Sequence, residues 1–340
     1  MAEQEKLLAA KGNGSGAKEV EQEVSHTTAG TRFERLCGMM AIGIFSTCYY
    51  YSVLYPLFVV IMLTAKGFTT TTLLLALPVL LSILLPSRQL PHLLATKFFK
   101  CALKYHEFEE IQETTDEELH ELSKTRNFIM AAQPHGVMSV AGICYAINRA
   151  PGEIPPSAVA SVLLRIPLMK QVFGSFNLID ASRKSLTKAL KKQSVVIYVG
   201  GMAELFLSHP SEERLFIAKR TGFLKLAMQT GSDVIPWYLF GNTSTLVVAR
   251  GSFLMALSRT LGVSITLLWG RWGLPLPMPR KIMCVMGRPM GLPQIDDPTP
   301  EQVKEWHDKY CAEVVRLFNK YKEKVPDYRH KHLILDVPSP

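Results

Sequence analysis

Metal-binding motifs and disulfide patterns are missing from this chain of 340 residues. Its six cysteines, at positions 37, 48, 101, 144, 284 and 311, include no CxxC pair and no paired Cys/His spacing. Neither a zinc site nor a disulfide framework is therefore predicted. We expect reduced thiols and a catalytic domain that faces the cytosol, where disulfides are rare. Internal repeats are not visible either.

Nucleic-acid modules are also missing, although the formal net charge is +9. The basic residues are scattered among apolar stretches and form no long basic stripe. A nucleic-acid partner is therefore not expected. An anionic membrane surface and a co-substrate that carries several phosphates explain the positive charge better.

Charged residues are missing from two apolar runs near the N-terminus, residues 37–65 and 68–85. Each run approaches the roughly 20 apolar residues that a helix needs to span a bilayer. We therefore expect a membrane helical hairpin over residues 36–86, with its turn at Lys66-Gly67. Positive residues flank the hairpin at Arg32, Arg35, Arg88, Lys97 and Lys100, whereas the turn carries Lys66 alone. This distribution places both ends of the hairpin in the cytosol.

The segments on either side of the hairpin differ in character. Residues 1–31 are polar and predicted to be disordered, which also argues against a cleaved signal peptide. Residues 87–335 form the expected catalytic domain. An alternative is that residues 36–85 are buried helices of a soluble protein. Whether the hairpin spans the bilayer or re-enters from one face stays open at this point.

Short apolar runs alternate with amphipathic helical patterns from Asn127 onward, which is typical of a mixed α/β domain. The expected strands cover residues 127–132, 195–199, 234–240 and 281–286, and the expected helices cover 137–147, 182–192 and 222–230. Residues 157–164 fit either a strand or a helix. Thr299-Pro300-Glu301-Gln302 has the capping-box pattern that begins a further helix.

A histidine stands where a buried strand passes into a helix, in the sequence Pro134-His135-Gly136. Strand-to-helix turns in α/β domains are common places for sites. Pro134 restricts the chain, Gly136 permits a tight turn, and the helix N-terminus offers backbone N–H groups to an oxyanion. Neutral His135 could take the proton of an attacking alcohol. The alternative is a buried or capping histidine without a chemical role.

A carboxylate follows paired glycines at the end of the next strand, in Gly200-Gly201-Met202-Ala203-Glu204. The glycines allow close approach of the backbone, and a carboxylate among apolar residues needs a partner. Glu204 could orient or charge-stabilise His135, or accept the hydrogen of the acceptor hydroxyl. The alternative is a solvated or salt-bridged glutamate beside a turn.

Basic residues near two expected helix starts are candidates for holding phosphates of coenzyme A. Lys219 and Arg220 precede Gly222, and Arg183 opens the earlier helix. Any one of these side chains is more often simply solvated.

Four motifs in order give the chain a recognisable character. They are Pro134-His135-Gly136, Gly200-Gly201-x-x-Glu204, the block from Arg220-x-Gly222-Phe223 to Phe240-Gly241-Asn242, and Gly287-Arg288-Pro289 followed by Pro298-Thr299. Together they resemble the type-2 diacylglycerol acyltransferase family, which also contains monoacylglycerol and wax-alcohol acyltransferases. The resemblance runs from the hairpin almost to the C-terminus.

The resemblance implies an acyltransferase fold, a mixed sheet flanked by helices, with His135 as the catalytic histidine. It also implies acyl-CoA as co-substrate, no metal or other cofactor, and an endoplasmic reticulum membrane or lipid-droplet location. Gln133 departs from the pattern, because animal members usually have histidine there and plant members often have glutamate. The His-to-Asp spacing of glycerol-phosphate acyltransferases is also absent, which leaves Glu204 as the candidate partner of His135.

We therefore expect direct acyl transfer to diacylglycerol in a ternary complex, with helix-terminal amides or Asn242 stabilising the oxyanion. A Cys144 nucleophile is disfavoured, since it would project two to three helical turns from His135. Alternatives are a monoacylglycerol or wax-alcohol acyltransferase, and a catalytically silent protein that binds lipid or lipid droplets. No residue selects the acceptor, and the oligomeric state stays open.

Overall fold

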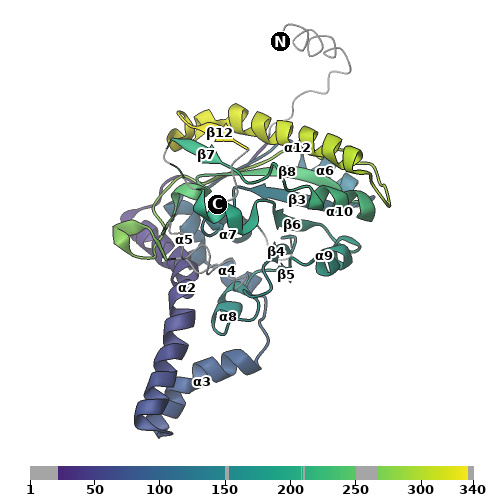
Figure 1. The fold of residues 1–340 in the computed structure, drawn as a ribbon. Helices are drawn as coiled ribbons and strands as arrows, with labels where there is room; N and C mark the ends of the chain where they lie inside the picture. The colour runs from purple at the N-terminus through teal and green to yellow at the C-terminus, as the bar shows by residue number, and fades with distance from the viewer. Residues whose placement is uncertain (1–21, 150–152, 208, 210, 250–266, 336–340) are drawn as a thin grey trace, which may run out of the picture.

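The structure is a computed structural model, which describes residues 22–149, 153–207, 209, 211–249 and 267–335. Its centre is an eight-stranded mixed sheet in the order β1-β2-β11-β8-β3-β6-β4-β5 (Figure 1). The strands are β1 Gln22–His26, β2 Glu109–Gln112, β3 Phe128–Gln133, β4 Ser157–Val159, β5 Leu178–Asp180, β6 Val195–Tyr198, β8 Asp233–Phe240 and β11 Met283–Met286. The expected mixed α/β fold is confirmed.

The central strands of the sheet are mostly parallel. β3 runs parallel to both β6 and β8, while β11 is antiparallel to β8. β3 is buried along its whole length, so it reads as a continuous apolar run, as parallel strands with both faces covered do. The first described segment, β1, pairs with β2. Part of the N-terminus that was expected to be disordered is therefore a strand.

Helices cover both faces of the sheet. α5 (Lys97–Tyr105), α7 (Val140–Asn148) and the first half of α2 (Arg32–Lys66) pack on one face, and α9 (Arg183–Leu190), α10 (Gly222–Thr230) and α12 (Pro300–Tyr321) pack on the other. The capping box predicted at Thr299 begins α12. The remaining helices are α3 Thr70–Leu84, α4 Pro91–Leu94, α6 Asp116–Ser123 and α8 Met169–Phe173. Two small sheets pair β9 (Val247–Val248) with β10 (Leu268–Trp269), and β7 (Glu212–Arg214) with β12 (His332–Ile334).

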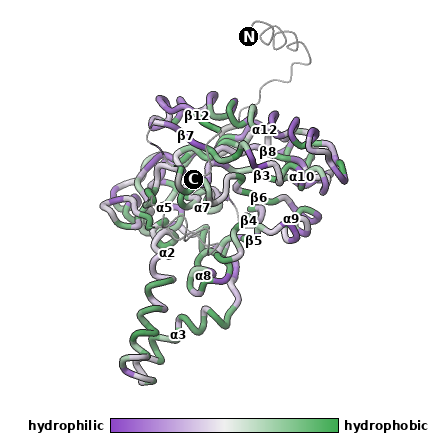
Figure 2. The backbone as a smooth tube through the Cα atoms, in the orientation of Figure 1, coloured by the Kyte–Doolittle hydropathy of each residue, from purple (hydrophilic) through white to green (hydrophobic). Residues whose placement is uncertain are grey.

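The helices α2 and α3 project from the α/β body and carry the apolar residues of the expected hairpin (Figures 1 and 2). Only the second half of α2 is free of the body. Phe45 and Cys48 are buried against it, whereas Val53 and Leu57 are more than half exposed. We call the exposed part of α2 from Val53 onward, together with α3, the apolar stalk.

Among the described residues, α2 is the one helix long and apolar enough to cross a membrane. α3 has 15 residues and spans about 22 Å, less than the roughly 30 Å of a bilayer's hydrocarbon core. The expectation that both apolar runs approach spanning length therefore holds for α2 and not for α3. The two helices meet at Gly67, which ends α2 with φ +67°.

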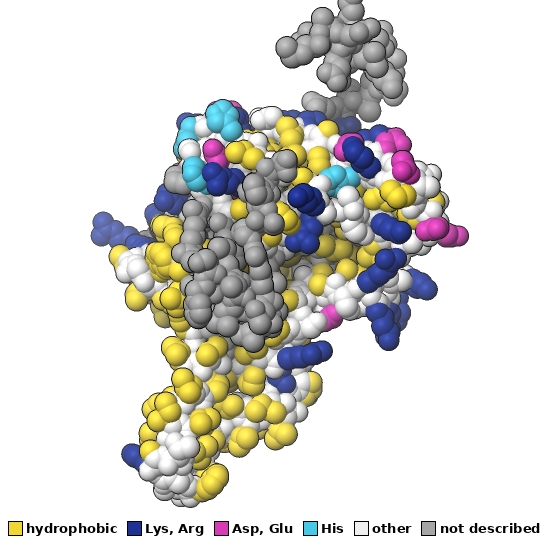
Figure 3. Space-filling view, viewed as in Figure 1, with side chains coloured by type: hydrophobic (Ala, Val, Ile, Leu, Met, Phe, Trp, Pro, Cys, Tyr) yellow, Lys and Arg dark blue, Asp and Glu magenta, His cyan; other side chains and the backbone are white. Residues whose placement is uncertain are grey.

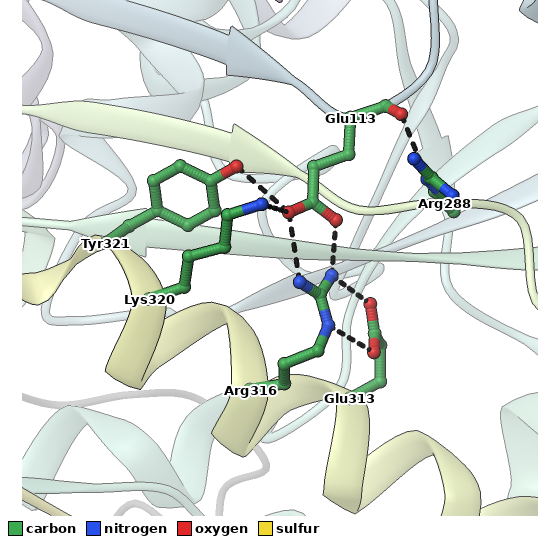
Figure 4. Close-up of polar contacts among 6 residues, drawn as sticks. All are labelled: Glu113, Arg288, Glu313, Arg316, Lys320 and Tyr321. Carbon is green, nitrogen blue, oxygen red and sulfur yellow. Dashed lines mark hydrogen bonds and ion pairs between the residues drawn. The ribbon is translucent and has the colours of Figure 1, made fainter. Parts of the chain in front are cut away.

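A buried carboxylate fixes α12 to the end of β2. The carboxylate of Glu113, just after β2, bonds to Arg316, Lys320 and Tyr321 of α12 (Figure 4). Arg316 also pairs with Glu313 one turn earlier. These charged hydrogen bonds lower the pKa of Glu113 against the opposing effect of its burial.

Candidate active site

A cavity of about 470 Å³ lies on the α7 face of the sheet. Most of its lining is apolar, and His135 is among the lining residues. Tyr49 of α2, Leu94 of α4 and Phe173 of α8 also line it. The cavity therefore extends from the end of β3 to the root of the apolar stalk.

His135 is held through its backbone on both sides. Its N–H donates to Glu204 Oε2 at 2.7 Å, and its carbonyl accepts from Asn242 Nδ2 at 2.6 Å. Gly136 follows with φ +63°, and a Cβ there would stand 3.0 Å from Asn242 Nδ2. The prediction that Gly136 permits a tight turn beside the histidine is borne out by this geometry.

The imidazole of His135 is in the state that a general base needs. Nδ1 lies 2.8 Å from the carbonyl oxygen of Gly136, and because that oxygen can only accept, Nδ1 carries the hydrogen. Nε2 then keeps its lone pair. Burial lowers the pKa of His135 below its usual value, which favours the neutral ring at pH 7. The ring of Tyr198 packs edge-on, with centroids 5.0 Å apart.

Glu204 contacts the main chain of His135 and not its ring. It is 2 % exposed, and its two oxygens accept the N–H groups of His135 and Phe216, at 2.7 and 3.1 Å. Burial raises the pKa of Glu204 to about 7, against the effect of the two hydrogen bonds. The expectation that Glu204 orients the imidazole is corrected, since the carboxylate positions the loop instead. A Cβ at Gly200 would lie 2.0 Å from its carboxyl carbon, which explains the first glycine of the pair.

Asn242 ties the histidine loop to the start of α7. Its Nδ2 donates to Pro134 O at 2.9 Å as well as to His135 O, and its Oδ1 accepts from Ala141 N at 3.0 Å. Gly142 N–H donates to the N-cap Ser139. Asn242 and the N–H groups of Ala141 and Gly142 are therefore already bonded within the protein, which disfavours them as oxyanion donors.

The turn that carries Asn242 is itself braced from the C-terminal part of the chain. Thr243 Oγ1 donates to the buried carboxylate of Glu213 at 2.9 Å. Glu213 in turn accepts from Lys331 Nζ at 3.3 Å, and this lysine is also buried. Sequence inspection missed this network, because its members are separated by 30 and 118 residues.

The basic residues expected at coenzyme A lie outside the cavity. Arg183 is exposed on α9 and donates to Gln229. Lys219 and Arg220 are exposed in the segment before α10, and the guanidinium of Arg220 lies over the ring of Phe216. None of them lines the cavity, and neither does Gly222, the first residue of α10. Gly201, with φ +59°, does line it.

Two further residues singled out from the sequence face away from the cavity. Gln133 is fully buried and accepts from Tyr310 of α12, so it does not line the site. Cys144 is also fully buried, and burial raises the pKa of its thiol well above the usual range. A thiolate nucleophile at Cys144 is therefore disfavoured by its protonation state as well as by its place.

Some lining residues were not predicted. Tyr198 ends β6, Ser139 caps α7, and Trp237 stands in the middle of β8. Ser139 had a local signal, since a serine before an apolar helical run is a common N-cap. Within the described part of the chain, no cluster of His, Cys, Asp and Glu side chains could hold a metal ion.

A family model and similar curated proteins indicate the family of this chain. Residues 97–336 match the family model for diacylglycerol acyltransferase. The human 2-acylglycerol O-acyltransferase 3 is 34 % identical over 60 % of this chain and 67 % of its own length. The human Diacylglycerol O-acyltransferase 2 is 29 % identical over 60 % of this chain and 59 % of its own length. The crystal structure of the 1-acyl-sn-glycerophosphate acyltransferase PlsC from Thermotoga maritima aligns with a TM-score of 0.43 at 15 % identity, over 84 % of this chain and 97 % of that one.

Proposed function

Because the chain belongs to the diacylglycerol acyltransferase family, we propose that it moves an acyl group from acyl-CoA to the free hydroxyl of diacylglycerol, with His135 as the general base. The observation that carries the proposal is the state of His135. Burial lowers its pKa and so favours the neutral ring, Nδ1 faces the carbonyl oxygen of Gly136, and His135 lines an apolar cavity at the root of the stalk.

The proposed reaction is a single acyl transfer without an acyl-enzyme. Nε2 of His135 takes the proton of the acceptor hydroxyl while that oxygen attacks the thioester carbonyl. The tetrahedral intermediate then expels the coenzyme A sulfur, which receives the proton from the imidazolium. An ester and free coenzyme A result, and no other reactant is consumed.

Backbone amides of the histidine loop are the best candidates for the oxyanion site. The N–H groups of Val137 and Met138 have no hydrogen-bond partner among the described residues, and both residues line the cavity. Fixed amides in a site that excludes water stabilise a developing oxyanion without reorganising. Glu204 and Asn242 act on this loop as positioning residues, because they hold the main chain of His135 from both sides.

The apolar stalk supports a membrane location for the acceptor. Its exposed leucines and valines leave a surface that water would not stabilise, and the cavity begins where the stalk joins the body. We place the stalk in the endoplasmic reticulum membrane, with both termini in the cytosol, and α3 shorter than a full span. Diacylglycerol dissolved in the bilayer could then enter the cavity directly.

The coenzyme A end of the donor would lie outside the cavity. Lys and Arg side chains gather over α9 on the body (Figure 3), and Arg183 is the first residue of this helix. With Lys219 and Arg220 it offers cations to the phosphates, while the acyl chain occupies the apolar cavity. No metal and no further cofactor enter the proposed mechanism.

Monoacylglycerol is the second candidate acceptor, because the human protein named 2-acylglycerol O-acyltransferase 3 is similar to this chain. A wax alcohol would need only the same histidine. Membranes that contain the full-length protein should be offered labelled acyl-CoA with equimolar diacylglycerol, 2-monoacylglycerol and hexadecanol. The proposal predicts triacylglycerol as the main labelled product. Label mainly in diacylglycerol would show that monoacylglycerol is the acceptor, and label mainly in wax ester would show that it is a long-chain alcohol. No transfer to any of the three would identify a silent lipid-binding protein.

A further inference from the structure

The motif Gly287-Arg288-Pro289 takes no part in the proposed site. It follows β11 and continues along β8: the N–H of Gly287 donates to Pro236 O in the middle of β8, and the N–H of Met290 donates to Val234 O near its beginning. His135 follows the other end of β3, which is parallel to β8. The motif and the histidine therefore lie at opposite ends of the central strands.

A second cavity, of about 390 Å³, opens beside this motif between α12 and the segments that follow β2 and β11. Its lining residues are Glu113, Arg288, Pro289, Met290, Trp306, Lys309, Glu313, Arg316 and Lys320. It has no lining residue in common with the cavity at His135. We call it the α12 pocket.

Arg288 is oriented in the α12 pocket but not neutralised there. Its Nε donates to the carbonyl oxygen of Glu113 at 3.2 Å, and its two terminal nitrogens have no partner among the described residues. The nearby carboxylate of Glu113 is committed to Arg316, Lys320 and Tyr321 instead (Figure 4). A guanidinium held at Nε presents its other two nitrogens in the fixed geometry that suits a phosphate.

The charge and the walls of the pocket define the kind of ligand. Four cationic and two acidic side chains line it, for a net charge of +2, and Lys309 also pairs with Glu305 outside the lining. With Glu305 counted, the group keeps a net charge of +1, which favours an anion. Trp306, Pro289 and Met290 supply an apolar wall, which suits a flat ring attached to the anion.

The position of the pocket indicates where the ligand comes from. α12 covers the face of the sheet opposite to the helices from which the stalk projects (Figure 1). A lipid headgroup in the membrane that holds the stalk would not reach this face. We propose that the α12 pocket binds a soluble nucleoside phosphate, with the phosphate on Arg288 and the base against Trp306.

The test is equilibrium binding of ADP to the full-length protein in nanodiscs, without acyl-CoA, because the nucleotide of coenzyme A would compete for the pocket. Arg288→Gln should weaken ADP binding at least tenfold, since the variant loses the free guanidinium. Lys309→Gln should weaken it about threefold. Lys304→Gln is the matched control on α12, because Lys304 pairs with Asp308 and lies outside the pocket, and it should bind like wild type.

Two further arms separate the parts of the ligand. Pyrophosphate should bind more weakly than ADP, and adenosine more weakly still, if anion and ring both contribute. Absence of saturable ADP binding to wild type, or equal affinity in a folded Arg288→Gln protein, would overturn the proposal. Without nucleotide, Arg288→Gln should keep the wild-type KM for acyl-CoA; a raised KM would show that the pocket belongs to the donor site instead.

Discussion

Replacing Glu204 by glutamine tests how the histidine loop is held. The two oxygens of the Glu204 carboxyl accept two backbone N–H groups and keep acceptor capacity when the group is protonated, whereas a glutamine amide accepts one and turns its NH₂ toward the other. A buried donor left facing another donor costs about 1–3 kcal/mol. At low pH the variant should therefore be less stable than wild type.

The difference in stability between Glu204→Gln and wild type should change with pH, because burial raises the pKa of Glu204 from 4.5 to about 7. A carboxyl whose folded-state pKa is raised stabilises the fold below the unfolded pKa, and that stabilisation is lost as the pH rises through the folded pKa. The shift corresponds to about 3 kcal/mol. Wild type loses this amount between roughly pH 4.5 and pH 7, and the glutamine variant does not.

Thermal unfolding of both proteins in detergent, at pH 5 and pH 8, measures the effect. The Tm of Glu204→Gln relative to wild type should rise by roughly 6 °C or more between these pH values. Glu121→Gln is the matched control, because the Glu121 side chain is 68 % exposed on α6, and its Tm difference should not change. If the Tm values of wild type and Glu204→Gln differ by the same amount at pH 5 and pH 8, the pKa of Glu204 is not raised in the folded protein.

Three other changes probe the packing and the stalk. Gly142→Ala should lower the free energy of unfolding by about 1–3 kcal/mol and slow acyl transfer, because the added Cβ would stand 2.1 Å from Tyr198 Oη. Gly222→Ala is the control: a Cβ there has nothing within 4 Å, so Tm and activity should stay near wild type. A similar loss from both would contradict this. Glu113→Gln should lower stability by about 2–3 kcal/mol in a denaturant titration, since Arg316 loses its buried partner; an unchanged midpoint would show that the network contributes nothing. The full-length protein should stay in the pellet after alkaline carbonate extraction, because the stalk is apolar, and its release would rule out an integral protein.

Local patterns predicted much of the fold. The expected helix at 222–230 is α10 without a change of boundary. β6 and β8 differ from expectation by one residue at one end, and β3 by one residue at each end. The helix after His135 begins later than expected, at Val140, because Ser139 caps it and the loop before it carries the histidine. Caps, apolar runs and glycines are local signals, so the sequence shows them directly.

Long-range contacts were not predictable in this way. Asn242 reaches His135 across 107 residues, and no local pattern says that it bonds to the loop's carbonyl groups and not to a substrate. The sequence also does not show which apolar residues of α2 are buried by the body. An exposed residue of the stalk such as Val53 and a core residue such as Phe45 look alike in sequence, although only Phe45 is buried by the body.

The most direct measurement of the central claim is acyl transfer by His135→Ala. The variant loses the base that takes the proton from a weakly acidic hydroxyl, which is worth about 10²–10⁴-fold in rate, or roughly 3–5 kcal/mol. Transfer from radiolabelled acyl-CoA should be measured in membranes at matched protein levels, with Glu204→Gln beside it as a variant that keeps the imidazole. The account predicts a loss of at least about a hundredfold for His135→Ala and a smaller loss for Glu204→Gln. A well-expressed His135→Ala protein that keeps more than about a tenth of the wild-type rate would show that His135 is a structural turn residue and not the base.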